Sequence, residues 1–170
     1  TVWTLALNYR VNEWVGLDGA NPIGYHLVNV GLHAGISWLV WVLLMDLGVT
    51  RRAALAAGLL FAAHPIHTEA VALLTNRATL LAAGLGLGFL LLHRRAPLVA
   101  ALCLVLALFS KESALVLLVI CIWLGWWFRP GERRQPWMVY AGYVLAALVW
   151  LGIRATVVGD RRHLSFAIDN

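Results

Sequence analysis

The sequence predicts an all-α integral membrane protein, a polytopic bundle of about six transmembrane helices. Hydrophobic residues make up 62% of the chain and charged residues only 12%, and the mean hydropathy is +0.81. Soluble proteins are about half apolar and about a quarter charged. At roughly 20 residues per span, the chain has room for about six spans and little else. We therefore expect a non-cytoplasmic segment over 1–23, the helical bundle over 24–158 and a non-cytoplasmic tail over 159–170.

Six apolar runs, separated by polar turns, define the expected helices. They cover 24–45, 53–63, 79–92, 97–109, 113–128 and 137–158. The four middle runs are short, because about 11 to 16 helical residues extend only ~17–24 Å against ~30 Å of hydrocarbon. These helices should therefore extend into the neighbouring polar residues, which would then be partly buried.

Clustered arginines occupy every second connection between the runs. The clusters are Arg51 with Arg52, Arg94 with Arg95, and Arg129 with Arg133 and Arg134. Such loops are typical of the cytoplasmic side, so both ends of this segment should lie outside. The third loop is flanked by an expected interfacial belt of Trp123, Trp126, Trp127 and Trp137. The net charge of +5 thus reflects topology and not binding of nucleic acid, and the excess of Arg over Lys is typical of a GC-rich bacterial genome.

A polar stripe marks the first span on the expected outer side. His26, Asn29, His33 and Ser37 follow i, i+3, i+7 and i+11, so they share one helix face. That face should meet protein or a wet cavity, because polar groups in hydrocarbon are costly. His33 and Ser37 lie deeper and favour interhelical hydrogen bonding. His26 lies near the outer end of the first span, where it could either line a functional site or form an interhelical hydrogen bond.

The segment His64–Glu69 interrupts a membrane helix with two imidazoles and a carboxylate. His and Glu are zinc ligands, but the spacing is not HExxH and Pro65 breaks the helical geometry. We expect no metal here. A structural polar turn and a substrate-facing site that includes His67 both remain open, and Glu69 is the residue to test first.

A tight outer turn at Ser110–Ser113 places Lys111 and Glu112 side by side. Glu112 falls in the first turn of the next helix, where the dipole favours a negative charge. Lys111, like Arg77 and Arg154, has no such explanation. These cations could pair with carboxylates or bind the phosphate of a lipid-linked donor.

Several motifs together resemble the membrane part of the transmembrane and tetratricopeptide-repeat O-mannosyltransferases and their bacterial relatives, within the GT-C class of glycosyltransferases. The matching segments are, in order, Thr4–Tyr9, Asn21–Asn29 with His33, His64–Val71 (HPIHTEAV), Ser110–Glu112 (SKE) and Ser165–Asn170. The resemblance covers essentially the whole chain, and the HPxHTE and SKE motifs together are fairly specific.

This resemblance implies a GT-C-like fold and transfer of a sugar, often mannose, from a polyprenyl phosphate to an acceptor protein or glycan on the non-cytoplasmic side. The donor is a substrate, and no cofactor or divalent metal is implied. Glu69 is then the candidate catalytic base. The donor-binding or site-lining candidates are His26, His64, His67, Arg77, Lys111, Glu112 and Arg154. The expected place is the bacterial inner membrane, with both ends of the segment in the periplasm.

Two departures from the family pattern limit this prediction. The paired acidic motif of the family falls upstream of Thr1, so we expect the chain to be part of a longer polypeptide that supplies it. Thr79 occupies a position where relatives often have an acid. The alternative is a catalytically inactive accessory subunit that packs in a larger membrane complex. Transport is less favoured, because the ionisable residues do not continue through the bilayer as a relay.

Overall fold

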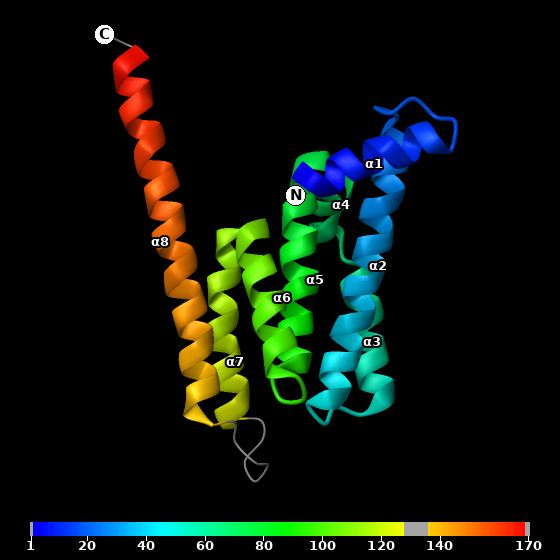
Figure 1. Cartoon of the computed structure of the whole chain (residues 1–170). Coiled ribbons are helices and arrows are strands. Elements are labelled where there is room, and N and C mark those ends of the chain that lie inside the picture. The colour runs from blue at the N-terminus through cyan, green and yellow to red at the C-terminus, as the bar shows by residue number, and fades with distance from the viewer. Residues whose placement is uncertain (1, 128–135, 169–170) are drawn as a thin grey trace.

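The computed structural model describes residues 2–127 and 136–168, and that part of the chain is helical with no strand (Figure 1). The elements are α1 (Val2–Trp14), α2 (Pro22–Asp46), α3 (Arg51–Ala63), η1 (Pro65–His67), α4 (Thr68–Ala72), η2 (Leu74–Asn76), α5 (Arg77–Leu92), α6 (Pro97–Ser110), η3 (Glu112–Leu115), α7 (Val116–Trp127) and α8 (Trp137–Ile168). The all-α prediction is therefore confirmed. Each predicted apolar run corresponds to a helix, and α8 continues through most of the segment predicted as a tail.

Local sequence signals set both ends of α2. The side chain of Asn21 accepts a hydrogen bond from the Ile23 N–H at 3.0 Å, and a proline opens the helix. At the other end Gly48 has φ 85°, and the Val49 N–H donates to the Leu44 carbonyl at 3.0 Å. This is a Schellman turn, which needs the left-handed conformation that glycine adopts readily. The turn reverses the chain into α3.

The long helices α3, α2, α5, α6 and α8 pack in this order, each against the next, and α7 contacts α5 and α8 (Figure 1). The largest group of buried apolar side chains lies at the α5 to α8 side of this row. It is formed by Phe89, Leu90, Ala100, Leu104, Ala107, Leu108, Ala114, Cys121, Tyr143, Ala147 and Trp150. Gly86 allows α7 to approach, because a Cβ there would meet the side chain of Leu117 at 2.6 Å. The core therefore packs α5 against α6, α7 and α8, and the other side of α5 packs against α2.

Successive long helices run in opposite directions, so every second connection lies at the same end of the bundle (Figure 1). The connection from α3 to α5, the α6–α7 turn and the C-terminal end of α8 all lie at this end, which we call the outer end. The helix α1 runs across it instead of along the bundle. The first two arginine pairs lie at the opposite end, where Arg95 pairs with Asp46 at 3.7 Å. The third arginine group, and the side chains of Trp126 and Trp127, lie outside the described residues.

Two of the described helices, α2 and the Trp137–Val157 part of α8, are long and apolar enough to cross a membrane. A third candidate span consists of Pro65–Ala72 and Arg77–Leu92, which meet at a bend of 114°. The helix α6 and the stretch Glu112–Gly125 are apolar but shorter. The structure thus supports two to three spans by length and composition, and the count of six stays a prediction.

Apolar side chains are exposed along the outer surfaces of these helices. Leu98, Val119 and Leu145 are 86%, 68% and 62% exposed, and Trp123 and Trp137 are also exposed. Such surfaces are unusual for a protein in water but expected for one in lipid. The described helices therefore support the interpretation that this is a membrane protein.

Candidate functional site

The predicted site residues fall into two clusters and one buried position instead of a single site. The first cluster lies between α2, α3 and η1, and the second lies between α6, η3 and α8. The helix α5 stands between them in the row (Figure 1). The structure thus brings together His26, His64 and His67 on one side, and Glu112 and Arg154 on the other.

The first cluster surrounds a cavity of about 320 Å³, which we call the histidine pocket. Its walls are small and mostly apolar apart from four imidazoles and one hydroxyl. The lining residues are His26, His33, Ala62, Ala63, His64, His67, Thr68, Val71 and Ala72. A pocket of this size with a few placed polar groups is of the kind that holds a small hydroxylated ligand.

Ring contacts fix His67 in the wall of the pocket. Its ring centroid lies 4.2 Å from that of Phe61, 5.1 Å from that of His33 and 6.1 Å from that of His64. The backbone N–H of His67 donates to the His64 carbonyl at 3.1 Å, but the His67 imidazole has ring contacts and no hydrogen bond to another described residue. The His67 imidazole is therefore held in place by packing, with both nitrogens free to bond a ligand.

Backbone contacts set the hydrogen-bonding roles of the other two close imidazoles. The Ile66 N–H donates to His64 Nδ1 at 3.2 Å, so a neutral His64 carries its proton on Nε2. His33 Nε2 lies 3.1 Å from the Ala62 carbonyl, so this nitrogen donates and Nδ1 is left as an acceptor. The pocket therefore offers both donors and acceptors. The residues that line it include no Lys or Arg, so it suits neutral hydroxyl groups better than a phosphate.

The deeper residues of the polar stripe have different roles. His33 bonds to α3, which confirms the predicted interhelical hydrogen bond. Ser37 does not, because its hydroxyl donates back to the His33 carbonyl at 2.8 Å within α2, so that prediction was wrong. Asn29 is fully buried and donates to the Val71 and Leu73 carbonyls at 3.1 and 3.4 Å. Asn29 thereby holds the connection after α4 against α2.

Glu69 lies beside the histidine pocket, on α4, but is not among the residues that line it. Its side chain is exposed, and its carboxylate has no hydrogen-bond or ion-pair partner among the described residues. Its backbone carbonyl accepts a hydrogen bond from Asn76 at 3.3 Å. A free carboxylate at this position is accessible to an acceptor that enters from the outer end. The described residues contain no group of three His, Cys, Asp or Glu that could hold a metal ion.

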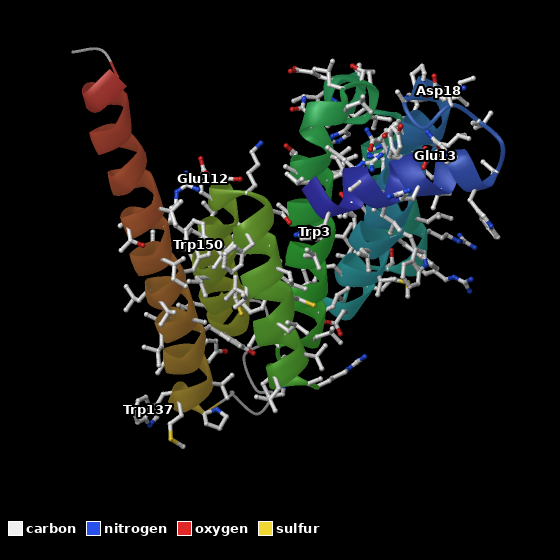
Figure 2. All side chains as sticks on the ribbon, turned by 45° about the horizontal axis from the view of Figure 1, so that its top comes forward. Trp3, Glu13, Asp18, Glu112, Trp137 and Trp150 are labelled. Carbon is white, nitrogen blue, oxygen red and sulfur yellow. The ribbon has the colours of Figure 1, made fainter. Side chains whose placement is uncertain are left out.

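The second cluster, which we call the cationic turn, contains Lys111, Glu112 and Arg154. Arg154 pairs with Glu112 at 2.9 Å and lies 5.5 Å over the Trp150 ring; Figure 2 labels Glu112 and Trp150 at this end of the bundle. Lys111 instead donates to the Thr79 hydroxyl at 2.8 Å. The charge of Arg154 is thus paired with a carboxylate. The exposed ammonium of Lys111 bonds only to a neutral hydroxyl and has two further N–H donors.

Arg77 corrects the sequence-based assignment, because its side chain is fully buried and does not line a surface site. Its Nε donates to Asn29 Oδ1 at 2.8 Å. One terminal nitrogen donates to Asn8 Oδ1 at 2.8 Å and to the Tyr25 carbonyl at 3.0 Å, and the other donates to the Thr4 carbonyl at 3.2 Å. The guanidinium therefore joins α1, α2 and α5, and four of its five donors are already used by the protein.

Two asparagines of α1 complete this buried network, and the sequence reading missed them. Asn8 donates to Asn12 Oδ1 at 3.3 Å. Asn12 donates to the Gly19 and Asn21 carbonyls, both at 3.1 Å. The signal that could have revealed them is the four-residue spacing of two Asn, which places both on one face of the helix. They attach α1 to the start of α2 and so shape the outer end beside the histidine pocket.

Comparisons with known proteins give a consistent set of relatives. Protein O-mannosyl-transferase Tmtc1 of Drosophila melanogaster is 43% identical over 123 residues, which is 68% of this chain and 14% of the fly protein. Protein O-mannosyl-transferase F38B6.6 of Caenorhabditis elegans is 35% identical over 128 residues, 72% of this chain and 18% of the worm protein. Human protein O-mannosyl-transferase TMTC4 is 41% identical over 94 residues, 45% of this chain and 12% of the human protein.

These matches cover less than a fifth of the length of each of these three relatives. No protein-family model matches the chain, and no solved structure matches it. The similarity extends over up to about three quarters of the chain, although its extent differs among the relatives. The comparisons therefore confirm the resemblance that the motifs predict: this chain is similar to one portion of the protein O-mannosyl-transferases.

Proposed function

We propose that this chain is the membrane portion of a glycosyltransferase that transfers a sugar from a polyprenyl-phosphate donor to an acceptor hydroxyl at the outer end of the bundle. The names of the relatives support the transferase class and make mannose the sugar to test first. The single observation that carries the proposal is the histidine pocket, because it is formed by the HPxHTE segment at the end of the molecule where polar groups gather.

The histidine pocket is assigned to the hydroxyl groups of the transferred sugar. Neutral imidazoles can donate to and accept from a hydroxyl, and the small neighbours Ala62 and Ala63 leave room for a ring. His67 supports this assignment most directly, because packing fixes its ring while its nitrogens have no partner among the described residues.

Lys111 is the candidate for the phosphate, and because it lies in the cationic turn, the donor would extend from the histidine pocket over the first turn of α5, where Lys111 bonds to Thr79. Its ammonium is exposed and bonded to a neutral hydroxyl, so a carboxylate does not cancel its charge. In the reaction the acceptor oxygen forms a bond to the anomeric carbon as the bond from that carbon to the phosphate oxygen breaks. The acceptor proton passes to a carboxylate, and the polyprenyl phosphate leaves with its negative charge stabilised by a cation. Glu69 is the described carboxylate nearest in sequence to the pocket and remains the candidate base.

The test compares Glu69→Gln with Glu13→Gln in the full-length protein that carries this segment. Purified protein is supplied with polyprenyl-phosphate mannose and an acceptor, and the transferred sugar is measured. Loss of a general base should lower turnover by about 100-fold or more in Glu69→Gln. Glu13 is also at the outer end but pairs with Arg10 at 3.5 Å, so Glu13→Gln should keep its activity. Equal turnover in the two variants would remove Glu69 from the mechanism.

A structural accessory subunit is the second candidate, and an apolar groove of about 480 Å³ between α2 and α5 favours it. Added Cβ atoms at Gly31 and Gly35 would meet no atom within 4 Å, so another transmembrane helix could approach closely there. Co-purification in fixed ratio with other membrane subunits, without transfer activity, would favour this function over the enzyme.

A further inference from the structure

The helix α1 has an inverted distribution of side chains. Its two buried residues are Asn8 and Asn12, which are 5% and 2% exposed. Its most exposed side chains include Trp3 and Trp14, which are 88% and 87% exposed. In water a helix of a folded protein buries its apolar face and exposes its polar face. The medium around the outward face of α1 is therefore not simply water.

Four exposed apolar residues of α1 form a continuous row, which we call the tryptophan stripe: Trp3, Leu7, Val11 and Trp14; the exposed Val2 and Tyr9 lie outside it. At 100° per residue, these four side chains fall within about 80° of one another on the helix. Leu7 and Val11 are 65% and 44% exposed. The buried asparagines lie about a third of a turn away, so the stripe is a flank of the helix and not its inner face.

A charged edge borders the stripe. Arg10 and Glu13 form an ion pair at 3.5 Å, with side chains 82% and 44% exposed. In Figure 2, Glu13 and Asp18 lie together toward the C-terminal end of α1, away from Trp3 at its start. The helix thus has three sides, of which one bonds to the bundle, one is apolar and one is charged. A helix that lies in the plane of a membrane surface has an apolar side and a charged side of this kind.

We propose that α1 lies in the boundary between headgroups and acyl chains of the bilayer, with the tryptophan stripe in contact with lipid. Three observations favour lipid over a protein partner. The helix crosses the end of the candidate spans, where the membrane surface falls (Figure 1). The first turns of α2, which follow α1 in the chain, also expose apolar side chains, since Ile23 and Leu27 are 62% and 64% exposed. Tryptophans stand at both of its ends, and their rings favour this interface.

The buried network gives α1 a fixed height relative to the spans. Arg77, at the start of α5, bonds to α1 through Asn8 and the Thr4 carbonyl. A helix held in this way cannot sink with its stripe into the hydrocarbon or lift away from it without breaking those bonds. The headgroup layer then lies at the level of the first two turns of α2, which contain His26 of the histidine pocket.

Site-directed spin labelling of the protein in vesicles of phosphatidylethanolamine and phosphatidylglycerol tests this inference and needs no catalytic activity. Nitroxides are placed at Leu7→Cys and Val11→Cys on the stripe and at Glu13→Cys on the charged edge as the matched control. Cys103 and Cys121 lie within α6 and α7, and unsubstituted protein gives their background. Collisions with oxygen, which concentrates in lipid, are compared with collisions with a water-soluble nickel chelate.

The ratio of oxygen to nickel collisions should be severalfold higher at positions 7 and 11 than at position 13. Nickel collisions at 7 and 11 equal to those at 13 would show that the stripe faces water and would overturn the proposal. Shielding of 7 and 11 from both reagents would show that protein covers the stripe, which overturns it as well. The two stripe positions are exposed, so a fold defect in one variant leaves the other as a test.

Discussion

Arg77 joins three segments through hydrogen bonds from one buried guanidinium. Its partners on α1 and α2 are the side chains of Asn8 and Asn29 and two backbone carbonyls. A buried cation is costly unless its donors are satisfied, and four bonds meet most of that need here. The side chain therefore acts as a structural element of the outer end.

We expect Arg77→Ala to lower the free energy of unfolding by about 3 kcal/mol or more, because it leaves the buried amide oxygens of Asn8 and Asn29 without donors. Thermal unfolding in detergent gives the comparison. Arg154→Ala is the matched control, since its surface ion pair with Glu112 contributes only about 0–1 kcal/mol. If both variants unfold at the same temperature, Arg77 does not have this role.

Single residues show where sequence reasoning reaches its limit. The polar character of the outer end was predictable, because ionisable groups between apolar runs are conspicuous. The burial of Arg77 was not, because its partners are 48 to 73 residues away and only the packing of α1 onto α2 brings them together. The bond from Lys111 to Thr79 spans 32 residues and was hidden for the same reason.

At the scale of elements, glycines decide how closely α1 approaches α2. A Cβ added at Gly24 would collide with the side-chain oxygen of Asn12, whereas one added at Gly31, on the same helix, would meet open space. Both glycines lie in α2, but only Gly24 is packed against α1. Comparing alanine at the two positions therefore distinguishes the effect of α1 packing from the higher helix propensity of alanine.

Gly24→Ala should destabilise the protein by about 1–3 kcal/mol, since the neighbour must move to admit the methyl group. Gly31→Ala should be neutral or stabilising by up to about 1 kcal/mol, because alanine favours helix. Thermal unfolding measures both, and limited proteolysis of the α1–α2 connection should be faster in Gly24→Ala alone. Equal behaviour of the two variants would contradict the observed approach of α1.

The helix boundaries were largely predictable, whereas α1 was not. Long apolar runs, a proline at the start of α2 and α6, and Gly48 after α2 are local signals. The apolar residues of the segment before α2 recur at helical spacing, but they face away from the bundle, and the inward face of the helix consists of Asn8 and Asn12. The position of α1 depends on tertiary hydrogen bonds, which a local pattern does not contain.

At the scale of the whole molecule, alternating helix directions separate a polar end from an arginine-bearing end. The alternation follows from connections too short to return along the bundle, so the sequence predicted it. The division of the polar end into the histidine pocket and the cationic turn was not predicted, because it depends on α5 standing between α2 and α6.

The two ends should label from opposite sides of a membrane. Cysteines placed at Asp18 and Ser113 should react with an impermeant maleimide added to one side of sealed vesicles, and a cysteine at Arg94 should react only when the reagent reaches the other side. The physical reason is that each ion-bearing connection stays in water on its own side. Reaction of all three from one side would contradict the arrangement of the spans.

Mannosyl transfer by the full-length protein with His67→Phe tests the central claim most directly. Phenylalanine keeps an aromatic ring against Phe61 and His33 and removes both nitrogens, but its six-membered ring is larger than imidazole, so thermal unfolding of the variant is measured as the control. Loss of the sugar contacts should lower kcat/KM by about 10-fold to 100-fold, as expected for about 1–3 kcal/mol of lost hydrogen bonding. Unchanged transfer by a stably folded His67→Phe protein would show that the histidine pocket does not bind the sugar.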